Sequence, residues 1–273
     1  MAVAAKLLLS AIVAVSGTNE VGLKFLEENK HKEGVVVLPS GLQYKVLRHG
    51  DGDGRPQPDG ECDCHYEGRT AQNYPSGETI DSSYKRGEHS TFAPTQVNKG
   101  FSEAMQLMVE GDKWELFIPS ELAYGESGRP PAVGAGDCLI FTLELLKIHG
   151  GKLIFEGPKG EERRVRTVFS SGLVQHYEGP KGEERIVRNV LADGSVMYHE
   201  GAKGEERQVR GDLADGSVMH LEGPKGEERV VRMERPDGAV EHYEGPRSNM
   251  RLLRTEMPDG SVIHNEDLTK DEV

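Results

Sequence analysis

Residues 101–118 read FSEAMQLMVEGDKWELFI, and this stretch decides the fold of the first half of the chain. Its apolar side chains recur at the i, i+3, i+4 and i+7 positions of a helix, namely Phe101, Ala104, Met105 and Met108. The pattern predicts a helix with one apolar face, which Gly111 is expected to end. Residues 113–118 follow at once and are typical of a strand. The stretch therefore predicts one helix joined to a sheet.

The sequence on both sides of this stretch predicts more strands. They are expected at residues 35–37, 43–47, 62–66 and 138–148. One face of the last strand is apolar, at Leu139, Phe141, Leu143 and Leu145. A short extra helix is expected from about Asn19 to just before Gly34, where Val21, Phe25 and Leu26 lie near helical spacing. Mostly antiparallel strands covered by one helix make an α+β fold.

After about Gly150 the sequence becomes repetitive. Glu-Gly recurs every 22 residues, starting at positions 156, 178, 200, 222 and 244, in a unit close to EGPKGEERxVRxxxxDGSVxHY. Each unit has two turn signals with strand-length pieces between them, so it is expected to be a hairpin. Five such hairpins predict an all-β array, either a meander or a solenoid. The expected segments are therefore 1–17, 18–34, 35–149 and 150–273.

The charge is acidic throughout. The chain of 273 residues has a formal net charge of −13, of which residues 1–150 carry −7 and residues 151–273 carry −6. This balance argues against binding to nucleic acid or to an anionic membrane surface, because both need a basic surface. In the repeats, Arg163, Arg166 and their copies each have Glu neighbours in the sequence, which favours cross-strand ion pairs over a phosphate-binding surface.

No metal site, cofactor or disulfide framework is expected. Cys62 and Cys64 lie on one face of their strand and His65 on the other, so the two thiols are expected to be core residues. A histidine position also recurs in the repeats, at His176, His220, His242 and His264, with Tyr198 in the gap. In a meander these positions lie about 9.6 Å apart, too far to share one metal ion.

The two ends of the chain suggest a destination. Residues 1–17 read MAVAAKLLLSAIVAVSG, with one Lys, an apolar stretch and small residues near its end, which predicts a secretory signal peptide. An uncleaved apolar helix is the alternative. The final residues, 270–273, read KDEV and are similar to a KDEL-type retention tail. The secretory pathway, in particular the endoplasmic reticulum lumen, is therefore expected, with the cytoplasm as the alternative. No later stretch is long and apolar enough to span a membrane, so none is expected in the mature chain.

Several short motifs between residues 35 and 148 occur together in one order. They are His65-Tyr66-Glu67-Gly68, Asp81-Ser82-Ser83-Tyr84-Lys85-Arg86-Gly87, Phe92 with Gln96-Val97, Glu110-Gly111-Asp112-Lys113-Trp114, Leu122-Ala123-Tyr124-Gly125, and Phe141 with Leu145-Leu146-Lys147-Ile148. In this combination the stretch closely resembles the FKBP-type peptidyl-prolyl cis-trans isomerases, especially the macrophage-infectivity-potentiator branch. The resemblance implies a twisted antiparallel half-barrel sheet wrapped on one helix, and polypeptides with X-Pro bonds as substrates.

The resemblance also implies a site. Its catalytic residues would be Asp81, Tyr124 and Tyr66. Its substrate-binding residues would be Ile80, Arg86, Phe92, Gln96, Val97, Asn98, Phe101, Val133 and Phe141. Phe101 would form the floor under the prolyl ring, and Tyr124 would donate a hydrogen bond to a substrate carbonyl. Arg86 and Tyr66 would hold the Asp81 carboxylate, while residues 125–136 would cover the site.

These residue types suit the reaction. Rotation about an X-Pro bond breaks no covalent bond, so no nucleophile, metal or cofactor is needed. The barrier arises because amide resonance is lost in the twisted state. A site accelerates rotation by binding the twisted amide better than either planar form. Aromatic walls and a few hydrogen bonds are therefore expected, with weak pH dependence near neutrality.

The sequence departs from the family pattern at four places. Phe101 stands where the family most often has Trp, Ile80 where Phe is common, and Asn98 where Ile is common, while residues 71–77 lengthen a loop. We expect retained but reduced isomerase activity and weakened binding of a macrolide ligand. The alternative is a catalytically weak FKBP-fold scaffold for protein binding. In either case the repeats, loosely similar to MORN repeats, are expected to bind clients or a protein partner of unknown identity.

Overall fold

The computed structural model describes residues 17–158 and 160–265. Residues 1–16 of the expected signal peptide and the KDEV end at 270–273 lie outside the described residues. The chain divides into two compact units, Met1–Lys152 and Leu153–Val273. Within the described residues, no helix combines the length and apolar character needed to cross a membrane.

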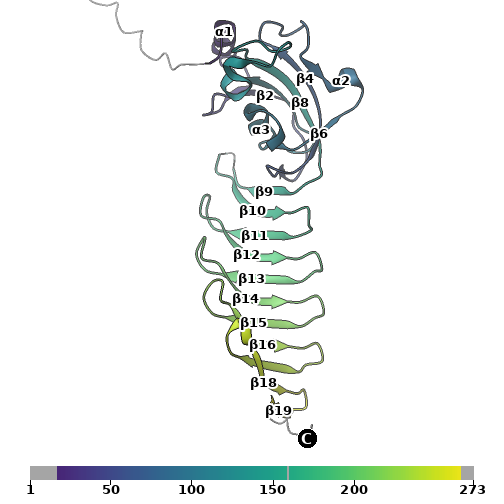
Figure 1. Cartoon of the computed structure of the whole chain (residues 1–273), viewed down its shortest axis with the longest axis vertical. Helices are drawn as coiled ribbons and strands as arrows, with labels where there is room; N and C mark the ends of the chain where they lie inside the picture. Colours follow the sequence, from purple (N-terminus) through teal and green to yellow (C-terminus); the bar gives the residue numbers. More distant parts are fainter. Residues whose placement is uncertain (1–16, 159, 266–273) are drawn as a thin grey trace, which may run out of the picture. The chain divides into compact units, whose positions relative to one another are not determined.

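The first unit is built on a seven-stranded sheet in the order β1-β2-β7-β8-β4-β5, with β6 paired to β4. Strands β2, β4, β6 and β8 of this sheet are labelled in Figure 1. All of these pairs are antiparallel. The strands are β1 (Val35–Val37), β2 (Gln43–Arg48), β4 (Cys62–Thr70), β5 (Asp81–Ser82), β6 (Ser90–Phe92), β7 (Lys113–Ile118) and β8 (Leu139–Ile148), with β3 (Arg55–Pro56) in the loop before β4. The helical segments are α1 (Glu20–Asn29), α2 (Ser83–Arg86), η1 (Pro94–Gln96), α3 (Lys99–Met105), η2 (Ser120–Leu122) and η3 (Gly125–Ser127). The α+β prediction is confirmed.

The two longer helices, α1 and α3, pack on opposite faces of the sheet. Helix α3 buries Phe101, Ala104 and Met105 in a core with Leu116 of β7 and Phe141 of β8. Helix α1 instead packs Leu26 against Phe117 and Ile140. Successive side chains of a strand point to opposite faces, so Leu116 and Phe117 serve different cores. Cys62 and Cys64 are both fully buried in the α3 core, as the strand alternation predicts.

Two details of the predicted helices are wrong. Helix α3 ends at Met105 rather than running on toward Gly111, and Gln106 caps it. Met108 keeps its buried position because its N–H bonds the Ala104 and Met105 carbonyls in the following turn. In α1, Val21 is 46% exposed. Gly22 takes the inner position instead, where an added Cβ would come within 2.7 Å of the Cys138 Cβ.

The second unit is a β-meander, not a solenoid. Strands β9 to β19 follow one another in the sheet in chain order. The successive strand pairs from β10 to β19 are antiparallel. The strands are β9 (Lys152–Glu156), β10 (Arg163–Val168), β11 (Val174–Glu178), β12 (Arg185–Val190), β13 (Val196–Glu200), β14 (Arg207–Asp212), β15 (Val218–Glu222), β16 (Arg229–Glu234), β17 (Val240–Glu244), β18 (Arg251–Glu256) and β19 (Val262–His264), with η4 (Arg247–Asn249) before β18.

The repeated sequence signals have local structural causes. Gly179 has a φ of +113°, and an added Cβ would lie 2.6 Å from the Glu183 carbonyl oxygen, so the Glu-Gly position requires glycine. In the second, third and fourth repeats, the Lys of the Gly-Pro-Lys-Gly or related turn reaches back to the preceding repeat. Lys181 Nζ donates to the Gly160 carbonyl at 2.7 Å, and Lys203 Nζ donates to the Gly182 carbonyl at 2.5 Å. These lysines lie 22 residues apart, and their hydrogen bonds therefore connect the turns of consecutive hairpins.

Candidate active site

An ionised carboxylate lies at the end of β4 and the start of β5. Asp81 is the first residue of β5 and pairs across the strands with Gly68 of β4. The Tyr66 hydroxyl donates to Asp81 Oδ2 at 2.7 Å. Arg86, at the end of α2, forms an ion pair with Asp81 Oδ1 and donates to the Tyr66 hydroxyl at 3.2 Å. We call Tyr66, Asp81 and Arg86 the carboxylate network.

The donors around Asp81 keep it charged. Partial burial acts to raise the pKa of the Asp81 carboxyl, but hydrogen bonds from the Tyr66 hydroxyl, the Ser82 N–H and Arg86 outweigh burial and lower it. Arg86 is itself positioned by Ser90, whose hydroxyl accepts from Nη2 at 2.9 Å. The carboxylate therefore remains ionised and fixed in orientation throughout the neutral pH range.

Four aromatic rings meet beside this network. Phe101 contacts Phe141, Phe92 and Tyr66 at centroid distances of 5.4, 5.7 and 6.2 Å, with ring planes close to perpendicular for Phe141 and Tyr66. Tyr66 also lies 6.1 Å from Phe92 and 6.3 Å from Phe141. Edge-to-face contacts of this kind stabilise one arrangement of the rings. We call Tyr66, Phe92, Phe101 and Phe141 the aromatic cluster.

Gly68 permits the position of Phe141. A Cβ added at Gly68 would lie 2.2 Å from Phe141 Cε1, so no other residue fits there without moving the ring. Gly68 is part of the His-Tyr-Glu-Gly motif, yet its packing role cannot be seen from sequence spacing. It depends on the pairing of Gly68 with Phe141 across β4 and β8.

The remaining expected site residues fall into two groups. Ile80, Val97 and Tyr124 are partly buried and pack against the same core as the aromatic cluster, and Val133 is fully inside that core. Gln96 is exposed, and its Oε1 accepts from the Ala93 N–H at 2.8 Å. The Asn98 side chain caps α3 by accepting from the Phe101 N–H at 3.0 Å. The side chains of Gln96 and Asn98 thus shape the backbone rather than line the cluster.

Arg129 contacts one of the expected site residues, Tyr124, and the sequence did not reveal this contact. Its Nη1 donates to the Tyr124 hydroxyl at 3.1 Å, and its guanidinium lies 5.6 Å from the centre of the Tyr124 ring. Since the tyrosine oxygen accepts from Arg129, its own hydrogen is directed away and is available to a carbonyl. An arginine five residues along an irregular loop follows no motif, so only the folded loop shows this contact.

The described residues supply neither a thiolate nor a metal-binding group of side chains at this site. Burial raises the pKa of Cys62 and of Cys138 to about 12 and also raises that of Cys64, so the thiols stay protonated. Among residues 17–158 and 160–265, no three His, Cys, Asp or Glu side chains are grouped to hold a metal ion. The single Trp, Trp114, stacks on Tyr44 at 4.4 Å and is not part of the aromatic cluster.

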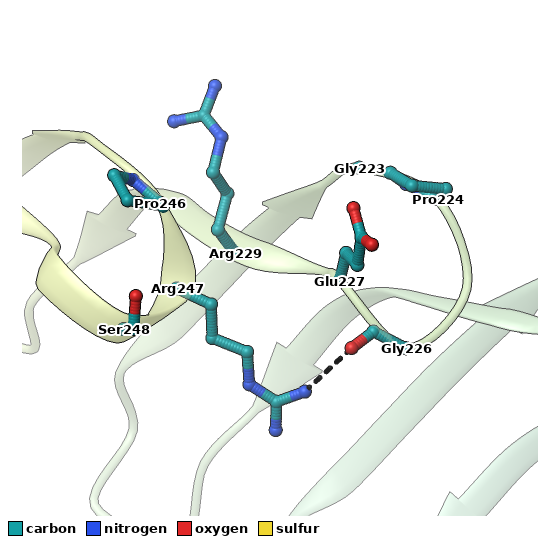
Figure 2. Close-up of a pocket in the computed structure, with 8 residues that line it drawn as sticks. All are labelled: Gly223, Pro224, Gly226, Glu227, Arg229, Pro246, Arg247 and Ser248. Carbon is teal, nitrogen blue, oxygen red and sulfur yellow. Dashed lines mark hydrogen bonds between the residues drawn. The ribbon is translucent and has the colours of Figure 1, made fainter.

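A separate pocket lies in the second unit, between the turns of the fourth and fifth repeats (Figure 2). Its lining includes Pro224, Glu227, Arg229 and Arg247, and Arg247 Nη1 donates to the Gly226 carbonyl at 3.4 Å. None of the residues expected at the active site lines it. Arg247 here takes the place of the Lys that joins the earlier turns, so the pocket coincides with a change in the repeat.

Comparison with known proteins connects this geometry to a family. Residues 52–146 match the family model of the FKBP-type peptidyl-prolyl cis-trans isomerase. Residues 10–46 match that of the domain amino terminal to FKBP-type peptidyl-prolyl isomerase.

Three relatives show how far the similarity extends. The peptidyl-prolyl cis-trans isomerase Mip of Coxiella burnetii is 44% identical, over 45% of this chain and 52% of its own length. The macrophage infectivity potentiator of Trypanosoma cruzi is 42% identical, over 48% of this chain and 65% of its own. The outer membrane protein MIP of Legionella longbeachae is 40% identical, over 46% and 52%. The chain thus spans between about half and two thirds of these relatives. Together with the antiparallel sheet wrapped on α3, these matches confirm that the first unit resembles the FKBP-type peptidyl-prolyl cis-trans isomerases, whose family model residues 52–146 match.

Proposed function

We propose that residues 35–149 catalyse the cis-trans isomerisation of X-Pro peptide bonds and thereby assist protein folding. The observation that carries the proposal is the placement of the aromatic cluster directly beside the carboxylate network, with Tyr66 shared by both. A ring-lined surface suits the apolar pyrrolidine of proline, and the fixed charge and hydroxyls suit the polar amide beside it. The family match of residues 52–146 supports the same conclusion.

The proposed mechanism is preferential binding of the twisted amide. Phe101, Phe92 and Phe141 hold the prolyl ring in an environment from which most water is excluded. Loss of resonance moves electron density back to the nitrogen and lessens the charge separation of the amide, so an apolar surface favours the twisted state over the planar forms. Each factor of ten in rate requires about 1.4 kcal/mol of such preference.

The polar residues orient the substrate. Tyr124 donates its hydroxyl hydrogen to a substrate carbonyl, while Arg129 holds the tyrosine oxygen. The Asp81 carboxylate, fixed by Tyr66 and Arg86, polarises the rotating amide from the wall of the site. Ile80, Val97 and Val133 complete the apolar surround, and the backbone at Gln96 and Asn98 supplies hydrogen-bonding groups to an extended peptide.

A direct test uses a short peptide with one X-Pro bond and the full chain. Exchange between the cis and trans signals, followed by NMR, should speed up in proportion to protein concentration. Phe101→Trp is a useful second sample, since it restores the residue more common in the family at the floor. If neither protein accelerates exchange, the alternative of a catalytically weak scaffold is preferred. Macrolide binding, weakened by the smaller floor, can be measured on the same two proteins.

We further propose that the repeats, residues 150–273, bind clients or a partner protein. Their single-layer sheet exposes two faces, and the second unit contributes none of the residues assigned to isomerisation. Deleting residues 151–273 should leave peptide turnover intact and abolish partner binding. A deletion that removes turnover while the first unit stays folded would refute this division of labour.

Entry into the secretory pathway, with retention in the endoplasmic reticulum lumen as the specific destination, is also proposed. It rests on the composition of residues 1–17 and the KDEV end, and one relative is named an outer membrane protein. An internally tagged chain should lose its N-terminal segment and fractionate with membrane-enclosed compartments. Recovery in the cytosol with Met1 intact would overturn the proposal.

A further inference from the structure

One face of the second unit carries an unbroken row of cationic and aromatic side chains. An arginine alternates with a histidine or tyrosine in directly paired positions from Arg166 to His264. The sequence led to the expectation of cross-strand ion pairs between Arg166, its copies and neighbouring Glu residues. Among the described residues, Arg166 and Arg188 form no such ion pair.

In the later repeats each arginine has a carboxylate of its own. The acid stands two residues further along the same strand, where it points to the same face. Arg210 Nε donates to Asp212 Oδ1 at 2.7 Å. Arg232 contacts the Glu234 carboxylate, and His220 Nε2 lies 3.0 Å from the same oxygen. An arginine and its paired histidine together therefore hold one carboxylate.

The first two repeats keep the arginines and the histidine but lack the acid. Val168 and Val190 stand 44 and 22 residues before Asp212, in the equivalent positions. Arg188 Nη2 has the His176 ring as its contact, with His176 Nε2 at 3.2 Å. The Nε of Arg166 is buried and has no hydrogen-bond partner within the described part of the chain. We call Arg166, His176 and Arg188 the open clamp.

Within residues 17–158 and 160–265, no ion pair neutralises the open clamp. Burial, followed by the charges of Arg188 and Arg166, lowers the pKa of His176. The nearest acid along the strand, Glu178, is engaged by Arg185 at 3.7 Å. On the other side the clamp borders Val168 and Val190, which are half-buried and apolar. A charged group in such a setting gains more from a partner than it would in open water.

We propose that the open clamp binds an Asp or Glu side chain of a partner polypeptide, with apolar residues on either side of that acid. The array itself supplies the template, because the same arginine and histidine positions hold Glu234 two repeats later. The valines suit the apolar flanks of the incoming segment. The net charge of −6 on residues 151–273 disfavours binding of a nucleic acid or an anionic membrane. A single carboxylate of a partner that enters the open clamp instead meets two arginines. This inference deepens the proposal that the repeats bind a partner.

The test uses the full chain and a fluorescein-labelled peptide of alternating Val and Glu, with a Val and Gln peptide as the control ligand. Fluorescence anisotropy should show binding of the Glu peptide only. Arg188→Gln and Arg166→Gln should each weaken it about tenfold, the scale of one charge-assisted hydrogen bond. Val190→Glu should weaken it at least as much, because it supplies an internal carboxylate at the position equivalent to Glu234. Arg232→Gln is the matched control, because Arg232 is already paired with Glu234. This variant should bind the Glu peptide as tightly as wild type does.

The proposal is overturned if folded Val190→Glu, judged by its thermal melt, binds the Glu peptide as tightly as wild type. It is equally overturned if the Gln peptide binds as well, or if Arg232→Gln weakens binding as much as Arg188→Gln. Displacement of the peptide by an equal concentration of inorganic phosphate would assign the clamp to phosphate instead. Turnover of an X-Pro peptide, measured on the same samples, reports on the first unit separately, so failure of the two proposals can be distinguished.

Discussion

Replacing Phe101 with Leu probes the aromatic cluster at its centre. Phe101 is 4% exposed, and its ring contacts Phe141, Phe92 and Tyr66. Each edge-to-face contact contributes about 0.5–1.5 kcal/mol beyond simple burial. Leucine is also apolar, but it loses the aromatic contacts of Phe101. Its own van der Waals contacts with the surrounding side chains offset part of this loss. We therefore expect the free energy of unfolding to fall by about 2 kcal/mol.

Activity should fall as well, because Phe101 is proposed to contact the prolyl ring. Loss of part of that contact should lower kcat/KM about tenfold, equivalent to roughly 1.4 kcal/mol of transition-state binding. The assay is turnover of an X-Pro peptide, with urea unfolding of the same samples to measure stability. Turnover must be measured well below the unfolding transition, so that the two effects are separated.

Phe117→Leu is the matched control. Phe117 is 2% exposed and contacts Phe25 and Tyr74 at 5.9 and 6.4 Å, but it lies in the α1 core on the other face of the sheet. It should lose about 1–2 kcal/mol of stability and keep kcat/KM within about twofold of wild type. Equal loss of kcat/KM in the two variants would refute the argument, because it would show that activity follows stability alone. Unchanged kcat/KM in Phe101→Leu would do the same.

The other predictions concern packing and pH. Gly68→Ala should lower the melting temperature and kcat/KM, because the new Cβ forces Phe141 to move at a cost of about 1–3 kcal/mol; an unchanged melt would contradict this. Activity should stay flat across neutral pH and decline only in acid, since the pKa of Asp81 is lowered and its carboxylate persists there; a sharp change near pH 7 in a pH profile would contradict the assignment. Partial burial acts to raise the pKa of Glu144, but donors from Tyr84, Arg48 and Lys113 lower it to about 2. Its contribution to stability is therefore present above its ordinary pKa of 4.5 and lost as pH falls toward about 2. In Glu144→Gln, the free energy of unfolding should fall less steeply as the pH is lowered. If its dependence on acidic pH is the same as in wild type, the role of Glu144 is contradicted.

Much of the first unit could be predicted because its signals are local. The apolar spacing from Phe101 to Met108 gave the helix face, and strand alternation placed Cys62 and Cys64 in one core. The errors arise where tertiary packing overrides spacing. Val21 follows the helical period, but the close approach of α1 to Cys138 admits only Gly22 on the inner side.

The site could be predicted only as far as its motifs reach. The carboxylate network follows from the resemblance, and the structure brings Tyr66, Asp81 and Arg86 together. The contact of Arg129 with Tyr124 depends on the path of an irregular loop, which no periodicity encodes. In the repeats, the valine at position 190 is visible in the sequence, but its meaning requires the strand register that places it beside Arg188 and His176.

We propose that the aromatic cluster and the carboxylate network form one prolyl isomerase site. Its most direct test is the refolding of a substrate protein whose slow phase is limited by proline isomerisation. The full chain should accelerate that phase in proportion to its concentration, and Asp81→Val and Tyr124→Phe should each be slower than wild type. If wild type and both variants all leave the slow phase as it is in buffer alone, the claim is contradicted.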